Sequence, residues 1–171
     1  MDFFTAVEQR YSHRTAYTSA PVPKEDLIKI LDAGLRAPSG CNAQTTSFIV
    51  VTNPDLRRQI AELLPAEAIL TAPALIIGIT EKVTFDFGLD FEVEDYSAAV
   101  ENILLAATAL GYVSCWYDGS SRLDGRDAAI AKLLDVPEGK QVRTILPIGV
   151  PEVVGIQAKR KAFDERVMWK E

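Results

Sequence analysis

Residues 98–119, AAVENILLAATALGYVSCWYDG, predict an apolar helix and a strand that follows it. From about Tyr96 to Gly111 the chain is rich in alanine and leucine, and Gly111 is a suitable residue to end the helix. A helix that is apolar nearly all round is buried in a core or in a subunit interface. YVSCWYDG is typical of a strand that runs into a turn. This stretch is therefore expected to form the centre of the fold.

Helices and strands lie on both sides of this centre without regular alternation. Before it, DFFTAVEQR, VPKEDLIKILDAGLRAPS and DLRRQIAELL have helical spacing, whereas SFIVVT and APALIIGIT are typical of strands. After it, GRDAAIAKLLDVP predicts a helix and QVRTILPIGVP a strand. The acidic segment 81–94 shows no clear period. Because GxGxxG and GxxxxGK(S/T) are both missing, we expect an α+β layer fold rather than a Rossmann or P-loop fold.

Length and composition indicate one globular domain over residues 1–171. The chain is 48% hydrophobic and 25% charged, and no repeat or linker interrupts it. A net charge of −6 argues against a nonspecific nucleic-acid binder, which needs a basic face. The N-terminal segment does not resemble a signal peptide, and no apolar run is long enough to span a bilayer. We therefore expect a cytoplasmic protein without membrane or nucleic-acid partners.

Histidine and cysteine are too scarce for most metal-binding or nucleophilic sites. The chain has a single histidine, His13, and two distant cysteines, Cys41 and Cys115. These do not make a metal-ligand constellation, and His13 would have to be the base in any Ser–His or Cys–His arrangement. We therefore nominate no metal ligand and no catalytic acid, base or nucleophile.

Two basic clusters could bind an anion. RYSHR places Arg10 and Arg14 around Ser12, and two guanidinium groups and a hydroxyl can converge on a phosphate if the helix breaks there. The alternative for this motif is a solvated basic helix end that balances the helix dipole. KRK at 159–161 is, by itself, typical of a solvated charge run.

The polar loop RAPSGCNAQTTSF, residues 36–48, separates a predicted helix from a predicted strand. Gly40 permits close backbone approach, and Ser39, Asn42 and Gln44 offer donors and acceptors suited to a planar heterocycle. The alternative is a helix-capping turn whose side chains satisfy one another.

RYSHR, APSGCNAQ, the stretch 98–119 and the ending GVPEVVGIQAKRKAFDERVMW together resemble the FMN-dependent nitroreductase family across nearly the whole chain. Each motif is weak alone, but four in this order and spacing make a strong signal. The resemblance implies helices around a mainly antiparallel central sheet, and a homodimer whose C-terminal arms extend over the partner subunit. The alternation of Phe163, Glu165, Val167 and Trp169 suits an arm that adds an edge strand.

The resemblance also assigns FMN-binding roles. Arg10 and Ser12, joined by Arg160, would hold the FMN phosphate, and Tyr11 is counted with them as a cofactor-binding residue. Arg14 would lie at the pyrimidine edge of the flavin, where a cation stabilises the negative charge that develops on reduction.

The rest of the flavin site would come from two loops. Pro38, Ser39 and Gly40 would approach the flavin of the partner subunit, with Asn42 and Gln44 bracing that loop. The backbone near the hydride-carrying flavin nitrogen would come from Tyr117, Asp118 and Gly119.

The sequence departs from the family pattern at two places. Thr45 and Thr46 follow Gln44 where Pro-Trp is frequent, which is expected to change the packing behind the flavin. Asp118 stands where glycine is usual, which would put an acid near the reactive face. The chain is also short for the family, so the segment Glu81–Glu94 would supply the cover over the flavin.

The function that the resemblance implies is an oxidoreductase that reduces nitroaromatics, quinones or similar electron-poor molecules by ping-pong hydride transfer from NAD(P)H. Two alternatives stay open. The same fold could catalyse another reaction, such as reductive dehalogenation or oxidation or reduction of a ring, or it could be a non-catalytic FMN-binding module.

Overall fold

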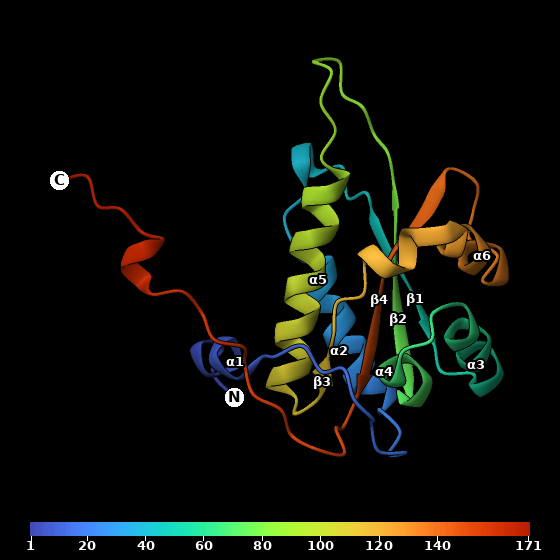
Figure 1. Cartoon of the computed structure of the whole chain (residues 1–171). Coiled ribbons are helices and arrows are strands. Elements are labelled where there is room, and N and C mark those ends of the chain that lie inside the picture. Colours follow the sequence, from blue (N-terminus) through green and yellow to red (C-terminus); the bar gives the residue numbers. More distant parts are fainter.

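The computed structural model describes residues 1–171 and builds them around one antiparallel sheet (Figure 1). The sheet runs in the order β1-β2-β4-β3, and every neighbouring pair is antiparallel. Its strands are β1 (Thr46–Val51), β2 (Ala74–Glu81), β3 (Val113–Ser114) and β4 (Lys140–Gly149). The predicted α+β fold with a mainly antiparallel sheet is therefore confirmed.

Helices cover both faces of the sheet. The α-helices are α1 (Phe3–Gln9), α2 (Lys24–Leu35), α3 (Pro54–Leu63), α4 (Glu67–Thr71), α5 (Glu92–Ala109) and α6 (Arg126–Leu133). Short 3₁₀ turns lie at Gly40–Asn42, Gly119–Gly125 and Phe163–Glu165. The helices α2 and α5 pack on one face, and α3, α4 and α6 pack on the other (Figure 1). None of the helices has both the length and the apolar content needed to cross a membrane.

Strand β2 links the two halves of the core. Leu75 and Ile77 belong to the cluster under α3, α4 and α6, whereas Ala74 and Ile76 belong to the cluster under α2 and α5. Successive side chains of a strand point to opposite faces, so a strand covered on both sides needs a continuous apolar run. This is why APALIIGIT predicted a buried strand correctly.

Helix α5 is the apolar helix that the sequence predicted, but it begins at Glu92 rather than near Tyr96. Its first turn contains Glu92, Glu94 and Asp95. Acidic residues in a first turn are favoured by the helix dipole. The loop before the helix is acidic too, so the sequence does not mark where the helix begins. That loop projects from the end of the sheet (Figure 1), and Phe85 stacks on Phe87 at its tip with a centroid distance of 5.3 Å. Helix α4 was not predicted because five residues show no clear period.

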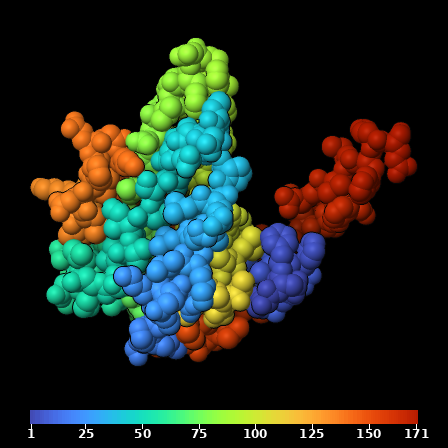
Figure 2. Space-filling view, turned by 180° about the vertical axis from the view of Figure 1, so that it is seen from behind, coloured from blue at the N-terminus to red at the C-terminus, as the bar shows by residue number.

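The C-terminal arm, residues 158–171, leaves the body of the molecule (Figures 1 and 2). All of its residues are exposed. Within one chain the arm pairs with no strand and forms a 3₁₀ turn at Phe163–Glu165, so its addition to a partner subunit as an edge strand stays a prediction. The turn is stabilised locally by the Ala162 N–H, which donates to Glu165 Oε1 at 3.0 Å. An edge strand also needs a neighbouring sheet edge, which the arm does not reach in its own chain.

Candidate functional site

The segment Arg10–Arg14 leaves α1 and runs beside β3. The helix ends at Gln9 with Arg10 as its extended C-cap, and the backbone N–H of His13 donates to Ser114 O at 2.9 Å. The helix is therefore broken where RYSHR begins, as convergence of its polar groups requires. Arg10 lies with its Nε 3.2 Å from Glu101 Oε1 of α5. Arg14 is exposed and donates to Ser12 O at 3.3 Å.

His13 and Tyr11 fix this segment to the body. The His13 ring is 2% exposed, lies 3.1 Å from Ala16 O through Nε2 and packs edge-on against Tyr17. The Tyr11 hydroxyl accepts a hydrogen bond from the Gly155 N–H at 2.9 Å. Tyr11 therefore ties the motif to the segment that leads into the arm.

Arg160 does not meet the other predicted phosphate-binding residues within one chain. Gln157 is the last residue with a side-chain bond to the body, donating to Arg10 O at 2.9 Å. Arg160 follows three residues later on the exposed arm. The structure thus brings Arg10, Tyr11 and Ser12 together and leaves Arg160 apart.

The turn Tyr117–Gly119 presents two unpaired backbone N–H groups. Tyr117 exchanges two hydrogen bonds with Ile145 of β4, at 3.1 and 2.8 Å, so its N–H is already used. The N–H groups of Asp118 and Gly119 donate to no acceptor in the chain. Gly119 is exposed, and no atom lies within 4 Å of the place where a Cβ would be. Asp118 and Gly119, and not Tyr117, therefore have main-chain N–H groups available to a ligand.

The RYSHR segment lies beside the strand that leads into this turn. Ser12 forms a parallel bridge with Ser114 of β3, although more than 100 residues separate them in the sequence. Burial raises the pKa of the Cys115 thiol, and the charge of Arg14 opposes the shift. Burial likewise raises the pKa of Tyr117, again against the effect of Arg14.

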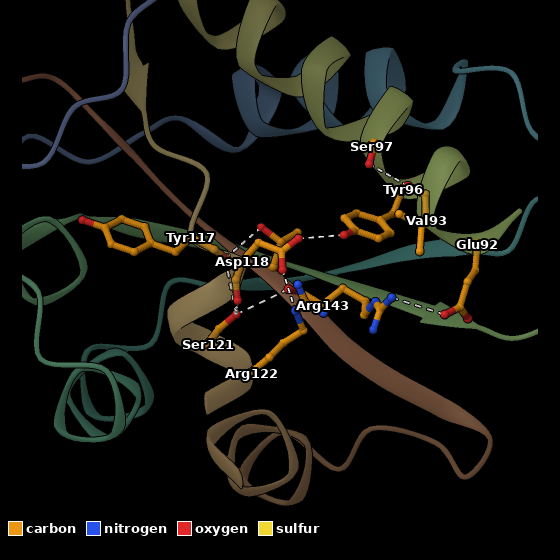
Figure 3. Close-up of polar contacts among 10 residues, drawn as sticks. Glu92, Val93, Tyr96, Ser97, Tyr117, Asp118, Ser121, Arg122 and Arg143 are labelled. Atoms are coloured by element: carbon orange, nitrogen blue, oxygen red, sulfur yellow. Dashed lines mark hydrogen bonds and ion pairs between the residues drawn. The ribbon is translucent and has the colours of Figure 1, made fainter. Parts of the chain in front are cut away.

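The Asp118 carboxylate is paired rather than free (Figure 3). Tyr96 donates its hydroxyl to Asp118 Oδ2 at 2.6 Å, and Arg122 Nε lies 2.6 Å from Oδ1 in an ion pair. Burial and the bond to Asp118 both raise the pKa of Tyr96, so its phenol remains a donor. The acid at position 118 is therefore held by a hydrogen bond from Tyr96 and by an ion pair with Arg122 that offsets its charge.

Arg143 of β4 extends this polar group toward the start of α5. Its guanidinium lies 5.5 Å from the centroid of the Tyr96 ring and donates to Glu92 Oε1 at 3.3 Å (Figure 3). Arg143 Nε and Glu92 Oε2 are buried without hydrogen-bond partners, as is Trp116 Nε1 beside them. The Tyr117–Gly119 turn thus packs on a compact set of charged and aromatic side chains from α5 and β4.

The Pro38–Gln44 loop is held by a residue that sequence reasoning did not identify. Asp95 of α5 is 3% exposed and accepts from the Gly40 N–H at 2.7 Å. Its other oxygen accepts from the Thr45 hydroxyl at 2.8 Å. Thr45, one of the two departures from the family pattern, therefore helps to close the loop onto the helix.

Asn42 and Gln44 differ in how they are held within this loop. The Gln44 N–H donates to Ser39 Oγ at 3.0 Å, whereas the Asn42 side chain makes no hydrogen bond. Both residues have positive φ, 56° and 51°, in which asparagine is more easily accommodated than most residues. A cavity of about 220 Å³ lies against the loop, with Pro38, Ser39 and Gln44 in its wall and Asp95 behind it.

Comparison with known proteins bears on the family and the fold. The model of the nitroreductase family matches residues 7–74 and 62–150. A Methanothermobacter thermautotrophicus protein named as an NADH dehydrogenase/NAD(P)H nitroreductase is 36% identical over 156 residues, covering 88% of this chain and 78% of the relative. An Archaeoglobus fulgidus protein of the same name is 34% identical over 145 residues, covering 83% of each. The solved structure of an FMN-dependent nitroreductase from Clostridium difficile R20291 superposes with a TM-score of 0.83 at 29% identity, covering 98% of this chain and 99% of that one.

The antiparallel sheet, the apolar central helix and the two loops held at its N-terminal end define a nitroreductase-like α+β protein. The chain belongs to the nitroreductase family.

Proposed function

We propose that the protein is an FMN-dependent oxidoreductase that passes a hydride from NAD(P)H to small electron-poor molecules, such as nitroaromatics or quinones, in a ping-pong reaction. The observation that carries the proposal is that RYSHR, which contains Arg14, runs beside β3, while the turn after β3 leaves the Asp118 N–H unpaired. One group supplies positive charge and the other a hydrogen-bond donor. A flavin ring has acceptor atoms on its pyrimidine edge and its central ring that suit both.

The chain's own residues provide binding and orientation. FMN supplies the hydride chemistry when bound, and the protein supplies position and charge. Arg14 stabilises negative charge on the pyrimidine side, and the Asp118 N–H donates to the reactive nitrogen of the ring. The neutralised Asp118 carboxylate adds no net negative charge that would oppose this.

The phosphate is held by the RYSHR segment and the arm. Arg10 uses Nε toward Glu101, which leaves its two terminal nitrogens free to donate to a phosphate. Ser12 is exposed next to it and offers a hydroxyl. Tyr11 fixes the segment through Gly155, and Arg160 joins the phosphate when the arm takes its place in the dimer.

The functional unit is a homodimer of a single domain, residues 1–171, with flavin sites shared between subunits. Pro38, Ser39 and Gly40 of one subunit approach the flavin of the other, with Asn42 and Gln44 behind them. Large apolar side chains that one chain leaves open support this assembly, since Phe4 is 76%, Ile156 90% and Trp169 74% exposed. The aromatic tip that contains Phe85 and Phe87 covers the substrate side.

Steady-state kinetics test the reaction. The FMN-loaded dimer is assayed anaerobically with NADH or NADPH and a nitroaromatic or quinone, both varied. Parallel double-reciprocal lines are expected, because the oxidised nicotinamide leaves before the electron-poor substrate binds. Intersecting lines would contradict the ping-pong order. A flavin-loaded protein with no turnover from either nicotinamide would instead favour the FMN-binding module, or a different electron donor.

A further inference from the structure

One turn of α5 holds both loops of the candidate site. Asp95 binds the Pro38–Gln44 loop through the Gly40 N–H and the Thr45 hydroxyl. Its neighbour Tyr96 binds the Tyr117–Gly119 turn through the Asp118 carboxylate. Consecutive residues of a helix point in directions about 100° apart, so the two side chains reach loops on different sides of the same turn.

The Asp95 side chain is held by two hydrogen bonds in a buried position. Its carboxylate is buried, and each oxygen accepts one short hydrogen bond. If the loop moved away, an ionised group would stay buried without partners, which is strongly unfavourable. The loop is therefore kept closed on α5 as long as Asp95 is present.

Tyr96 is held equally well from the other side. It is 4% exposed, and its ring packs edge-on against Trp116 at 6.1 Å and under Arg143 at 5.5 Å. The hydroxyl position is thus fixed, and through it the Asp118 carboxylate. The backbone on either side of Asp118 is held as well, since Tyr117 bonds to Ile145 and the Ser121 N–H donates to Asp118 O at 3.0 Å, so the bond from Tyr96 completes the support of the Asp118 N–H.

We propose that Asp95 and Tyr96 are positioning residues for the two flavins of the dimer. Asp95 sets the loop that forms a wall of the partner's flavin, and Tyr96 sets the Asp118 N–H at the flavin of its own subunit. The inference rests on the proposed function, because it takes the roles of both loops from there. Neither side chain touches the flavin or the substrate.

Substitutions at Asp95 and Tyr96 are expected to change different properties of the protein. In Asp95→Ala the Pro38–Gln44 loop loses its hydrogen bonds to α5 and is no longer held in place as a wall of the flavin site. The FMN dissociation constant should therefore rise about 10- to 100-fold, as expected for the loss of a charge-assisted hydrogen bond. Tyr96→Phe removes one oxygen and should leave FMN affinity within about 3-fold. It should shift the flavin midpoint potential and lower kcat without raising KM, since only the donor at the reactive nitrogen is displaced.

Two further variants separate positioning from general damage. Asn at position 95 keeps an oxygen for the Gly40 N–H, and its amide can donate to the Thr45 hydroxyl, so Asp95→Asn should restore most of the affinity. Ser97→Ala is the matched control, because the Ser97 hydroxyl bonds only to Val93 O inside α5, at 2.6 Å. It removes a hydroxyl from the same turn without affecting either loop.

The experiment measures FMN affinity by fluorescence titration, midpoint potential and steady-state kinetics on full-length dimers of all four variants. If Asp95→Ala does not fold, Thr45→Val tests the same bond and should weaken FMN binding at least 3-fold. The proposal stands if Asp95→Ala mainly weakens FMN binding, Tyr96→Phe mainly changes the midpoint potential and kcat, and Ser97→Ala matches wild type. It is overturned if Asp95→Ala or Thr45→Val binds FMN like wild type, or if Tyr96→Phe has an unchanged potential and kcat. A wild-type protein that binds no FMN would refute the proposed function instead.

Discussion

Gly40→Ala is expected to destabilise the protein through one defined collision. A Cβ at Gly40 would lie 2.6 Å from Phe91 Cβ and would also overlap Phe91 Cγ and Cδ2. Rotation of the Phe91 ring cannot remove the contact with its own Cβ. The φ of Gly40 is not positive, so alanine adds no backbone strain and the effect is steric.

The size of the stability loss follows from the displacement of the loop or of Phe91 that an alanine at position 40 requires. Forcing extra atoms into a packed site costs about 1–3 kcal/mol. Because the Gly40 N–H also donates to Asp95 at 2.7 Å, displacing the loop weakens a bond to a charged group, which is worth about 1.5–3 kcal/mol. The two costs overlap, so we expect the free energy of unfolding to fall by about 2–4 kcal/mol.

Urea unfolding of the flavin-free protein, at one fixed protein concentration, measures this loss. Gly119→Ala is the control, because Gly119 has no atom within 4 Å of its Cβ position and does not have positive φ. The control should lie within about 0.5 kcal/mol of wild type. A Gly40→Ala protein as stable as wild type, or a control that is equally destabilised, would refute the packing of the loop against Phe91.

Four further outcomes are expected. Arg14→Ala should lower the flavin midpoint potential in potentiometry while flavin remains bound more weakly, because a cation near the reduced ring is lost; an unchanged potential would make Arg14 a surface charge. Truncation before Ala162 should reduce dimerisation and flavin retention, followed by light scattering with flavin absorbance; a truncated yellow dimer would contradict it. The raised pKa of Tyr96 means that the folded state binds the phenol proton more tightly than the unfolded state. The stability that this proton contributes is present below about pH 10 and is lost as the pH rises further. In urea unfolding, the free energy of unfolding of Tyr96→Phe should therefore fall less steeply with alkaline pH than that of wild type. Maleimide labelling read by mass spectrometry should modify exposed Cys41 well before buried Cys115, whose thiol has a raised pKa, and equal rates would contradict that burial.

The layers of the fold could be predicted because their signals are local. The unbroken apolar run of β2 and the apolar surface of α5 each require cover on more than one side, whatever the rest of the chain does. The motifs RYSHR and APSGCNAQ indicated breaks in the backbone for the same reason. Their polar and glycine residues mark places where the helix must end and the backbone must turn.

The supports of the site could not be predicted because they depend on distant partners. Asp95 meets Gly40 across 55 positions, and Tyr96 meets Asp118 across 22. In the sequence, Asp95 is one acid among several at the end of an acidic segment, and nothing local distinguishes it. The conformation of the arm depends on a partner in the same way, since alternating apolar residues make a strand only where a sheet edge is available.

The central claim is that this chain binds FMN and that NAD(P)H reduces it there. An anaerobic absorbance spectrum of the purified protein, before and after addition of NADH or NADPH, tests it most directly. The account predicts a yellow protein with about one noncovalent FMN per subunit. Its visible flavin band should be bleached by a nicotinamide and restored by an electron-poor acceptor. A colourless protein that takes up no FMN in titration would contradict the claim.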